Sequence, residues 1–153
     1  ITHRLAGLGA MTFEGHRAEN IAGAEVVVTS SAIAKDNPEV AEARRLHIPV
    51  IQRAEMLSEL MRLKYGIAIA GMHGKTTTSA MAAHVLREGG LHPSHYVGAE
   101  IPLLGSNAHW DSRGEYFVAE GDESDGTLRF FKPKASSSAP EILLLRGAEA
   151  RRF

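Results

Sequence analysis

The chain has 153 residues, of which 44% are hydrophobic and 23% are charged. These values are typical of a packed globular protein with one ordinary domain, or with parts of two. The 17 basic and 18 acidic residues leave a formal net charge of −1, so the sequence has no electrostatic signature of nucleic-acid or anionic-lipid binding. The absence of cysteine excludes disulfides, thiolate zinc sites and cysteine nucleophiles.

Nothing in the sequence indicates a membrane segment. No apolar run reaches the roughly 18 residues that a membrane span needs, and the N-terminus lacks the pattern of a signal peptide. We therefore expect a cytoplasmic protein with no membrane partner and no nucleic-acid partner. The chain begins at Ile1 and not at methionine, which favours a fragment of a longer protein.

Residues 1–64 alternate short apolar strands with helical stretches, the pattern of a parallel sheet covered by helices. Three adjacent valines in residues 25–29 predict a strand buried on both faces. Asn37 is predicted to cap a helix with Pro38 in its first turn. A strand at residues 48–51 should follow. The apolar face of the next predicted helix is formed by Met56, Leu57, Leu60 and Met61.

The opening strand and glycine-rich turn of such a unit are not evident, because Gly7-Leu8-Gly9 is the only candidate and indicates an ordinary turn.

A second α/β stretch begins with a predicted strand at residues 65–70. A helix from about Lys75 to a stop at Gly89-Gly90 comes next, and further strands are expected at residues 96–97 and 116–119. The apolar face of this helix is predicted to carry Met81, Ala82, Val85 and Leu86. The segment 135–140 has the composition of a linker.

A strand, a glycine-bounded loop and a helix succeed one another around Gly71, the order that binds a polyphosphate. Gly71 and Gly74 allow backbone N–H groups to approach phosphate oxygens with no Cβ in the way. Lys75 is predicted to bridge the β- and γ-phosphates, and the Thr76 hydroxyl to ligate Mg²⁺. The loop is a short variant, since Ile69 stands where the longer motif has glycine. The candidate nucleotide-binding residues are Gly71, Met72, His73, Gly74, Lys75, Thr76 and Thr77.

An acidic cluster follows the predicted strand at residues 116–119. Ligands of parallel α/β sheets bind beyond the C-terminal ends of the strands, so this cluster and Gly71 should share one crevice. Glu120 is therefore predicted to be a magnesium ligand beside the phosphate loop, although an acidic run alone is more often a solvated loop. His73 is either a pH-sensitive contact or a residue that orders the loop backbone.

These motifs resemble the Mur ligase family over about residues 5–134. The segment from Ala70 to Thr78 resembles the family's ATP loop, in the form carried by the branch that adds L-alanine. Residues 119–125 resemble that branch's A-E-A-D-E-S-D segment. Gly15-His16 and other short upstream segments resemble its UDP-binding domain. Met72 departs from the family's usual threonine, and nothing after Lys134 matches the family pattern.

The resemblance implies an α/β fold: residues 1–64 as the rest of a Rossmann-like UDP-sugar-binding domain, 65–134 as the start of a P-loop, parallel-sheet ATPase domain, and 135–153 as an atypical tail. It implies an ADP-forming ligase that uses ATP and Mg²⁺ to join L-alanine to UDP-N-acetylmuramate in peptidoglycan precursor synthesis. Lys75 would then be the catalytic residue that stabilises γ-phosphate charge. The residues nearest the substrate would be Asp122, Glu123 and Ser124.

Two alternatives remain open. The murein tripeptide recycling ligase is a close cousin, disfavoured because that enzyme tends to have tyrosine where Ser124 stands. A non-catalytic nucleotide-binding module that merely retains the loop belongs to another class of protein. Because much of the ATPase domain and the amino-acid-binding domain are expected to be absent, we expect no ligase activity and weak or no ATP binding from this chain alone.

Overall fold

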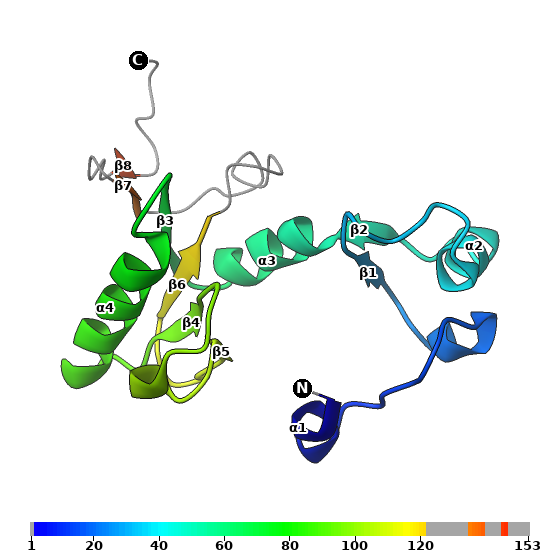
Figure 1. Cartoon of the computed structure of the whole chain (residues 1–153), viewed down its shortest axis with the longest axis horizontal. Coiled ribbons are helices and arrows are strands. Elements are labelled where there is room, and N and C mark those ends of the chain that lie inside the picture. The colour runs from blue at the N-terminus through cyan, green and yellow to red at the C-terminus, as the bar shows by residue number, and fades with distance from the viewer. Residues whose placement is uncertain (1, 122–134, 140–144, 147–153) are drawn as a thin grey trace. The chain divides into compact units, whose positions relative to one another are not determined.

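The computed structural model describes residues 2–121, 135–139 and 145–146 (Figure 1). The chain divides into two compact units, Ile1–Arg53 and Ala54–Phe153. Among the described residues, no helix combines the length and the apolar character needed to cross a membrane. The mixed α/β fold with parallel strand pairing that the sequence predicts is confirmed.

The first unit contains a small parallel sheet and short helices. Its β1 and β2 strands pair with Val28 opposite Ile51. The elements in chain order are α1 (Thr2–Gly7), the 3-10 helix η1 (Ala18–Ile21), β1 (Val27–Thr29), α2 (Pro38–Arg45) and β2 (Val50–Gln52). Both strands are shorter than, or shifted from, the segments predicted for them, because pairing with a neighbour and not apolar composition alone sets where a strand ends.

The predicted cap of α2 is confirmed. The Asn37 side chain accepts hydrogen bonds from the backbone N–H groups of Glu39 at 2.9 Å and Val40 at 3.4 Å, and Pro38 is the first helical residue. These bonds satisfy two donors that have no partner within a helix. Glu39 in turn accepts from Asn20 at 2.6 Å, and its other carboxylate oxygen lies 2.8 Å from a His16 ring nitrogen, which ties η1 to α2.

The prediction that the valine strand is buried on both faces is wrong. Val28 is 41% exposed, and Val26, just outside β1, is also exposed. Among the described residues β1 pairs with β2 alone. A two-stranded sheet has too little neighbouring surface to bury both faces of a strand, whatever its composition.

The second unit is built on a six-stranded sheet with the order β5-β4-β6-β3-β7-β8 (Figure 1). Its four inner strands, β4, β6, β3 and β7, are parallel, and β5 and β8 pair antiparallel at the edges. The elements are α3 (Arg53–Arg62), β3 (Tyr65–Gly71), α4 (Lys75–Glu88), β4 (Ser94–Tyr96), the 3-10 helix η2 (Pro102–Leu104), β5 (Ala108–His109), β6 (Tyr116–Glu120), β7 (Ala135–Ala139) and β8 (Leu145–Arg146).

The core of this unit lies on both faces of the sheet, because alternate residues of a strand point to opposite sides. Ile69 of β3 and Val118 of β6 pack with residues of α4. Ala68 and Ala119, their neighbours along the same strands, pack with Met61 of α3. The two central strands are thus fixed between two helices, and their C-terminal ends are held side by side.

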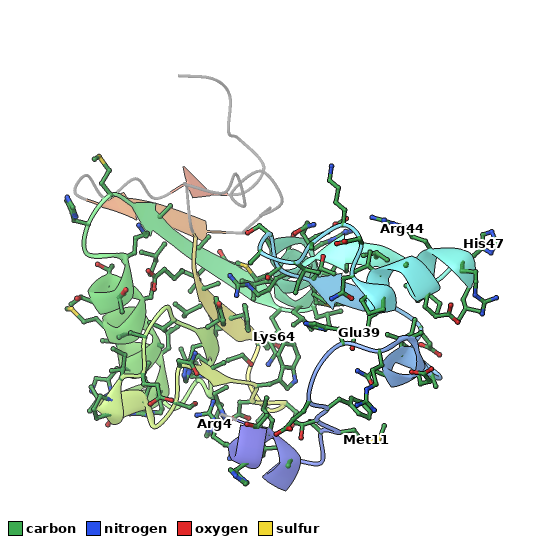
Figure 2. The ribbon with its side chains drawn as sticks, turned by 45° about the vertical axis from the view of Figure 1, so that its right-hand side comes forward. Arg4, Met11, Glu39, Arg44, His47 and Lys64 are labelled. Atoms are coloured by element: carbon green, nitrogen blue, oxygen red, sulfur yellow. The ribbon has the colours of Figure 1, made fainter. Side chains whose placement is uncertain are left out.

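Lys64, labelled in Figure 2, fixes the loop that leads into β6. Its ammonium donates hydrogen bonds to the backbone carbonyls of Asp111 and Gly114, the latter at 2.5 Å, and lies 4.5 Å from the centroid of the Trp110 ring. Asp111 also pairs with Arg113 at 2.7 Å, and this guanidinium holds the pKa of the carboxyl far below its usual range. These contacts anchor the start of the strand that ends at Glu120.

Two predictions about this unit require correction. Of the four residues predicted for the apolar face of α4, Ala82 and Leu86 pack against the core, whereas Met81 and Val85 are 62% and 66% exposed. The buried residues of α4 are Ser79, Ala80 and Ala83. Small residues allow the helix backbone to approach the sheet closely, so they occupy the most buried positions of α4. The linker-like segment 135–140 also contains a strand, β7, because the open edge of β3 offers backbone groups that this segment can pair with.

The Asn37 cap gives a test of the first unit. Substitution Asn37→Ala is expected to lower the free energy of unfolding by about 1 kcal/mol, because it leaves helix N–H groups without their acceptor. Urea titration followed by circular dichroism measures the loss. Asn37→Ser, which keeps a capping oxygen, should recover most of it, and an equal loss in both variants would contradict the role assigned to the cap.

Candidate functional site

The site begins at the turn between the middle strand and its following helix. β3 ends at Gly71, whose φ of 141° is rare for residues with a Cβ, and Gly74 has a left-handed φ of 78°. Because L side chains disfavour these conformations, glycine is required for the chain to leave the strand and enter α4 within three residues. Met72 and His73 lie between the two glycines with exposed side chains.

The helix that follows directs the N–H groups of its first turn to this turn of the chain. α4 starts at Lys75 with Gly74 as its N-cap, and Gly74 has no side chain that could cap the helix. The first four N–H groups of a helix have no partner inside the helix, and the helix dipole makes this end attractive to anions. Thr77 lies in the first turn of α4 with an exposed side chain. The predicted phosphate loop therefore has the strand, turn and helix arrangement that anion binding requires.

Lys75 folds back over the loop. Its ammonium nitrogen lies 2.6 Å from the backbone carbonyl oxygen of Gly71, to which it donates a hydrogen bond, and the side chain is half-buried. An ammonium has three donors, so this bond leaves two of them for an anion at the turn. The positive charge is thus held beside the N-terminal end of α4.

Thr76 and Glu120 meet, although 44 residues separate them in the sequence. The Thr76 hydroxyl oxygen lies 3.1 Å from each carboxylate oxygen of Glu120. Parallel pairing of β3 with β6 places Glu120 opposite Ile69, near the end of β3 and close to the start of α4. The phosphate loop and the segment after β6, predicted from the sequence to lie together at the C-terminal ends of the two strands, are therefore in contact through these two side chains.

A third group at this place was missed by sequence reasoning. The backbone N–H of Gly98, two residues beyond β4, donates a 2.7 Å hydrogen bond to the Glu120 carboxylate. A glycine after a short strand has no motif around it that could have indicated this contact. The Glu120 carboxylate at the end of β6 thus contacts both the start of α4, which follows β3, and the backbone just beyond β4.

The donors present suit a hard cation. A hydroxyl and a carboxylate are oxygen ligands of the kind Mg²⁺ prefers, and Mg²⁺ usually takes one or two protein ligands and completes its shell with water and phosphate oxygens. The described residues contain no group of three or more histidine, aspartate or glutamate side chains suited to a metal ion. A site of this composition fits a cation that arrives with a nucleotide better than one held by protein ligands alone. The candidate substrate residues Asp122, Glu123 and Ser124 lie outside the described residues.

Comparison with known proteins adds family information to this geometry. The model of the Mur ligase family, catalytic domain, matches residues 1–65, a stretch that ends at the first residue of β3. A UDP-N-acetylmuramate–L-alanine ligase from Koribacter versatilis (strain Ellin345) is 66% identical over 125 residues, which cover 82% of this chain and 26% of the relative. The chain thus spans about a quarter of the length of that relative.

Solved structures agree with this match. The UDP-N-acetylmuramate-alanine ligase of Thermotoga maritima has a TM-score of 0.78 and 29% identity, with 93% of this chain and 34% of that one covered. The UDP-N-acetylmuramate:L-alanyl-gamma-D-glutamyl-meso-diaminopimelate ligase of Neisseria meningitides has a TM-score of 0.79 and 27% identity, with 90% and 48% covered. The shared fold and the high identity to a curated relative lead to one conclusion: the chain belongs to the Mur ligase family.

Proposed function

We propose that this chain supplies the phosphate-binding part of an ADP-forming ligase that uses ATP and Mg²⁺ to join L-alanine to UDP-N-acetylmuramate. The observation that carries the proposal is the contact of Thr76 with Glu120 at the mouth of the loop between Gly71 and Lys75. The C-terminal ends of β3 and β6 bring together a hydroxyl, a carboxylate, an ammonium and a helix N-terminus. These groups form a site for a metal-bound polyphosphate.

In this proposal each side chain has a separate task. The N–H groups from Gly71 to Thr77 bind phosphate oxygens, and the Lys75 ammonium stabilises the charge that develops on the γ-phosphate. Thr76 and Glu120 would hold Mg²⁺, which would neutralise phosphate charge. Because the Thr76 proton is donated to Glu120, the hydroxyl lone pairs are available to the cation. His73 is placed in the loop as a further nucleotide contact.

The reaction proceeds in two transfers. A carboxylate oxygen of UDP-N-acetylmuramate attacks the γ-phosphorus, the bond to the β–γ bridging oxygen breaks, and ADP leaves. The amine of L-alanine then attacks the acyl carbon, and inorganic phosphate leaves with the carboxylate oxygen. We place residues 1–64 in the UDP-sugar-binding domain and 65–134 in the ATP-binding domain, with Asp122, Glu123 and Ser124 on the substrate side. A cytoplasmic location, where ATP is available, is part of the proposal.

The alanine-adding activity is favoured over tripeptide recycling by sequence identity. The Koribacter versatilis relative, named as an alanine ligase, is 66% identical, whereas the Neisseria meningitides ligase, which is named for a tripeptide, is 27% identical. The fold that the solved structures share does not separate the two amine substrates. The choice between the substrates therefore follows the closer sequence relationship.

The role of Lys75 separates a nucleotide site from an inert glycine turn. In the chain with ADP and Mg²⁺, NMR amide signals from Gly71 to Thr77 are expected to shift on titration. The Lys75→Ala variant should bind about 10-fold more weakly or worse, because a charge-assisted hydrogen bond is lost. Lys35→Ala, which removes the same charge from an exposed position in the first unit, is the matched control. Equal affinities in all three proteins would contradict the assignment.

The length of the chain relative to its family gives a second expectation. Because the chain spans 26% of the Koribacter versatilis ligase, we predict no alanine-dependent release of ADP from the purified protein, and ATP binding weaker than micromolar. A coupled assay for ADP and calorimetric titration with ATP test the two statements. Alanine-dependent turnover, or sub-micromolar affinity for ATP, would show that this part of the family fold functions alone.

A further inference from the structure

Gly98 contacts the candidate metal site without contributing a side chain. Its N–H donates to Oε2 of Glu120 at 2.7 Å, and the same carboxylate accepts from the Thr76 hydroxyl. β4 and β6 are parallel, with Tyr96 opposite Ala119, so Gly98 lies just beyond the point where Glu120 ends its strand. The carboxylate therefore accepts hydrogen bonds from a backbone donor and from a hydroxyl donor.

The space occupied by the carboxylate is available only because residue 98 has no Cβ. An added Cβ would lie 2.9 Å from Oε2, 3.2 Å from Cδ and 3.3 Å from Oε1 of Glu120. Real Cβ atoms do not make contacts below about 3 Å with heavy atoms, so the carboxylate would have to move. The φ angle of Gly98 is not in the left-handed region, so backbone conformation is not the reason for glycine here.

This arrangement lets a substitution at residue 98 change the site without a large change in the free energy of unfolding. The atoms that an added Cβ would meet are the far end of a flexible side chain, which can turn aside at small cost to the fold. Turning aside would break the bond to the Gly98 N–H and carry the carboxylate away from Thr76. A substitution at residue 98 should thus affect the site much more than the free energy of unfolding.

We propose that Gly98 is a positioning residue for the magnesium site: its N–H orients the Glu120 carboxylate, and its missing Cβ gives the carboxylate room beside Thr76. The inference rests on the proposed function, in which Thr76 and Glu120 hold the cation. Groups that orient the ligands of a metal ion typically contribute 10-fold or more to its affinity. Residue 98 belongs to this class through its backbone alone.

The test uses Mn²⁺ as a paramagnetic substitute for Mg²⁺, added to the chain in the presence of millimolar ADP. In the parent protein, Mn²⁺ should broaden the NMR amide signals of Thr76, Gly98 and Gly121. Gly98→Ala should raise the Mn²⁺ concentration for half-maximal broadening by about 10-fold. The thermal unfolding midpoint should stay close to that of the parent.

Gly66→Ala is the matched control. Its added Cβ would also meet the end of a flexible side chain, Cε of Met61 at 3.0 Å, in the same unit and away from Glu120. This variant should keep the parent Mn²⁺ dependence. An unchanged Mn²⁺ dependence in Gly98→Ala, or the same weakening in both variants, would overturn the positioning role and leave the metal site standing. No broadening near Thr76 in the parent would instead overturn the metal site, and this role of Gly98 with it.

A second measurement does not depend on the folding of Gly98→Ala. In the parent protein the Gly98 amide proton should resonate downfield, as expected for a donor to a carboxylate, and Glu120→Gln should move it upfield. The amide of Gly66 should not respond. A Gly98 signal that is indifferent to Glu120→Gln would show that the hydrogen bond, and hence the positioning role, does not exist.

Discussion

The passage from β3 into α4 constrains the rest of the second unit. The chain leaves a buried central strand at Gly71 and enters a helix at Lys75, and the left-handed backbone at Gly74 makes so short a turn possible. A short turn of this kind leaves helix N–H groups pointing beyond the strand end. Phosphate recognition at this site depends on the position of that helix end relative to the neighbouring strands.

The sheet supplies the second requirement, a carboxylate at the same place. β6 is hydrogen-bonded to β3 along its whole length, so its last residue, Glu120, is brought level with the end of β3. Lys64 holds the loop before β6. The small buried residues of α4, Ser79, Ala80 and Ala83, let the helix lie close to the strands. The 3.1 Å contacts between Thr76 and Glu120 are thus a product of register and packing, with neither residue near the other in sequence.

Sequence reasoning succeeded where local chemistry decides the structure. Asn37-Pro38 begins a helix because the Asn37 side-chain oxygen accepts hydrogen bonds from the first turn and the fixed φ of Pro38 suits the first helical position. Neither property depends on distant residues. The strand before Gly71 and the helix after Gly74 were also predictable, since apolar composition and glycine conformations specify them locally. The resemblance to Mur ligases in the loop and in the segment around Glu120 agrees with the family assignment.

Predictions from the sequence were wrong where contacts between distant segments determine the structure. The valines around Val28 are exposed because burial needs a neighbouring layer, and Met81 points outward because smaller residues of α4 suit the sheet better. Segment 135–140 has the composition of a linker but contains a strand, because it forms parallel backbone pairing with the edge of β3. Gly98 could not be identified at all, because its role depends on the distance of its N–H from a side chain 22 residues away.

We propose that the loop between Gly71 and Lys75, next to Thr76 and Glu120, binds the terminal phosphates of a nucleotide. A crystal structure of the chain grown with ADP and Mg²⁺ tests it most directly. We expect a β-phosphate within hydrogen-bonding distance of N–H groups in the first turn of α4, with the cation close to Thr76. Nucleotide density elsewhere, with the loop amides facing solvent, would contradict it.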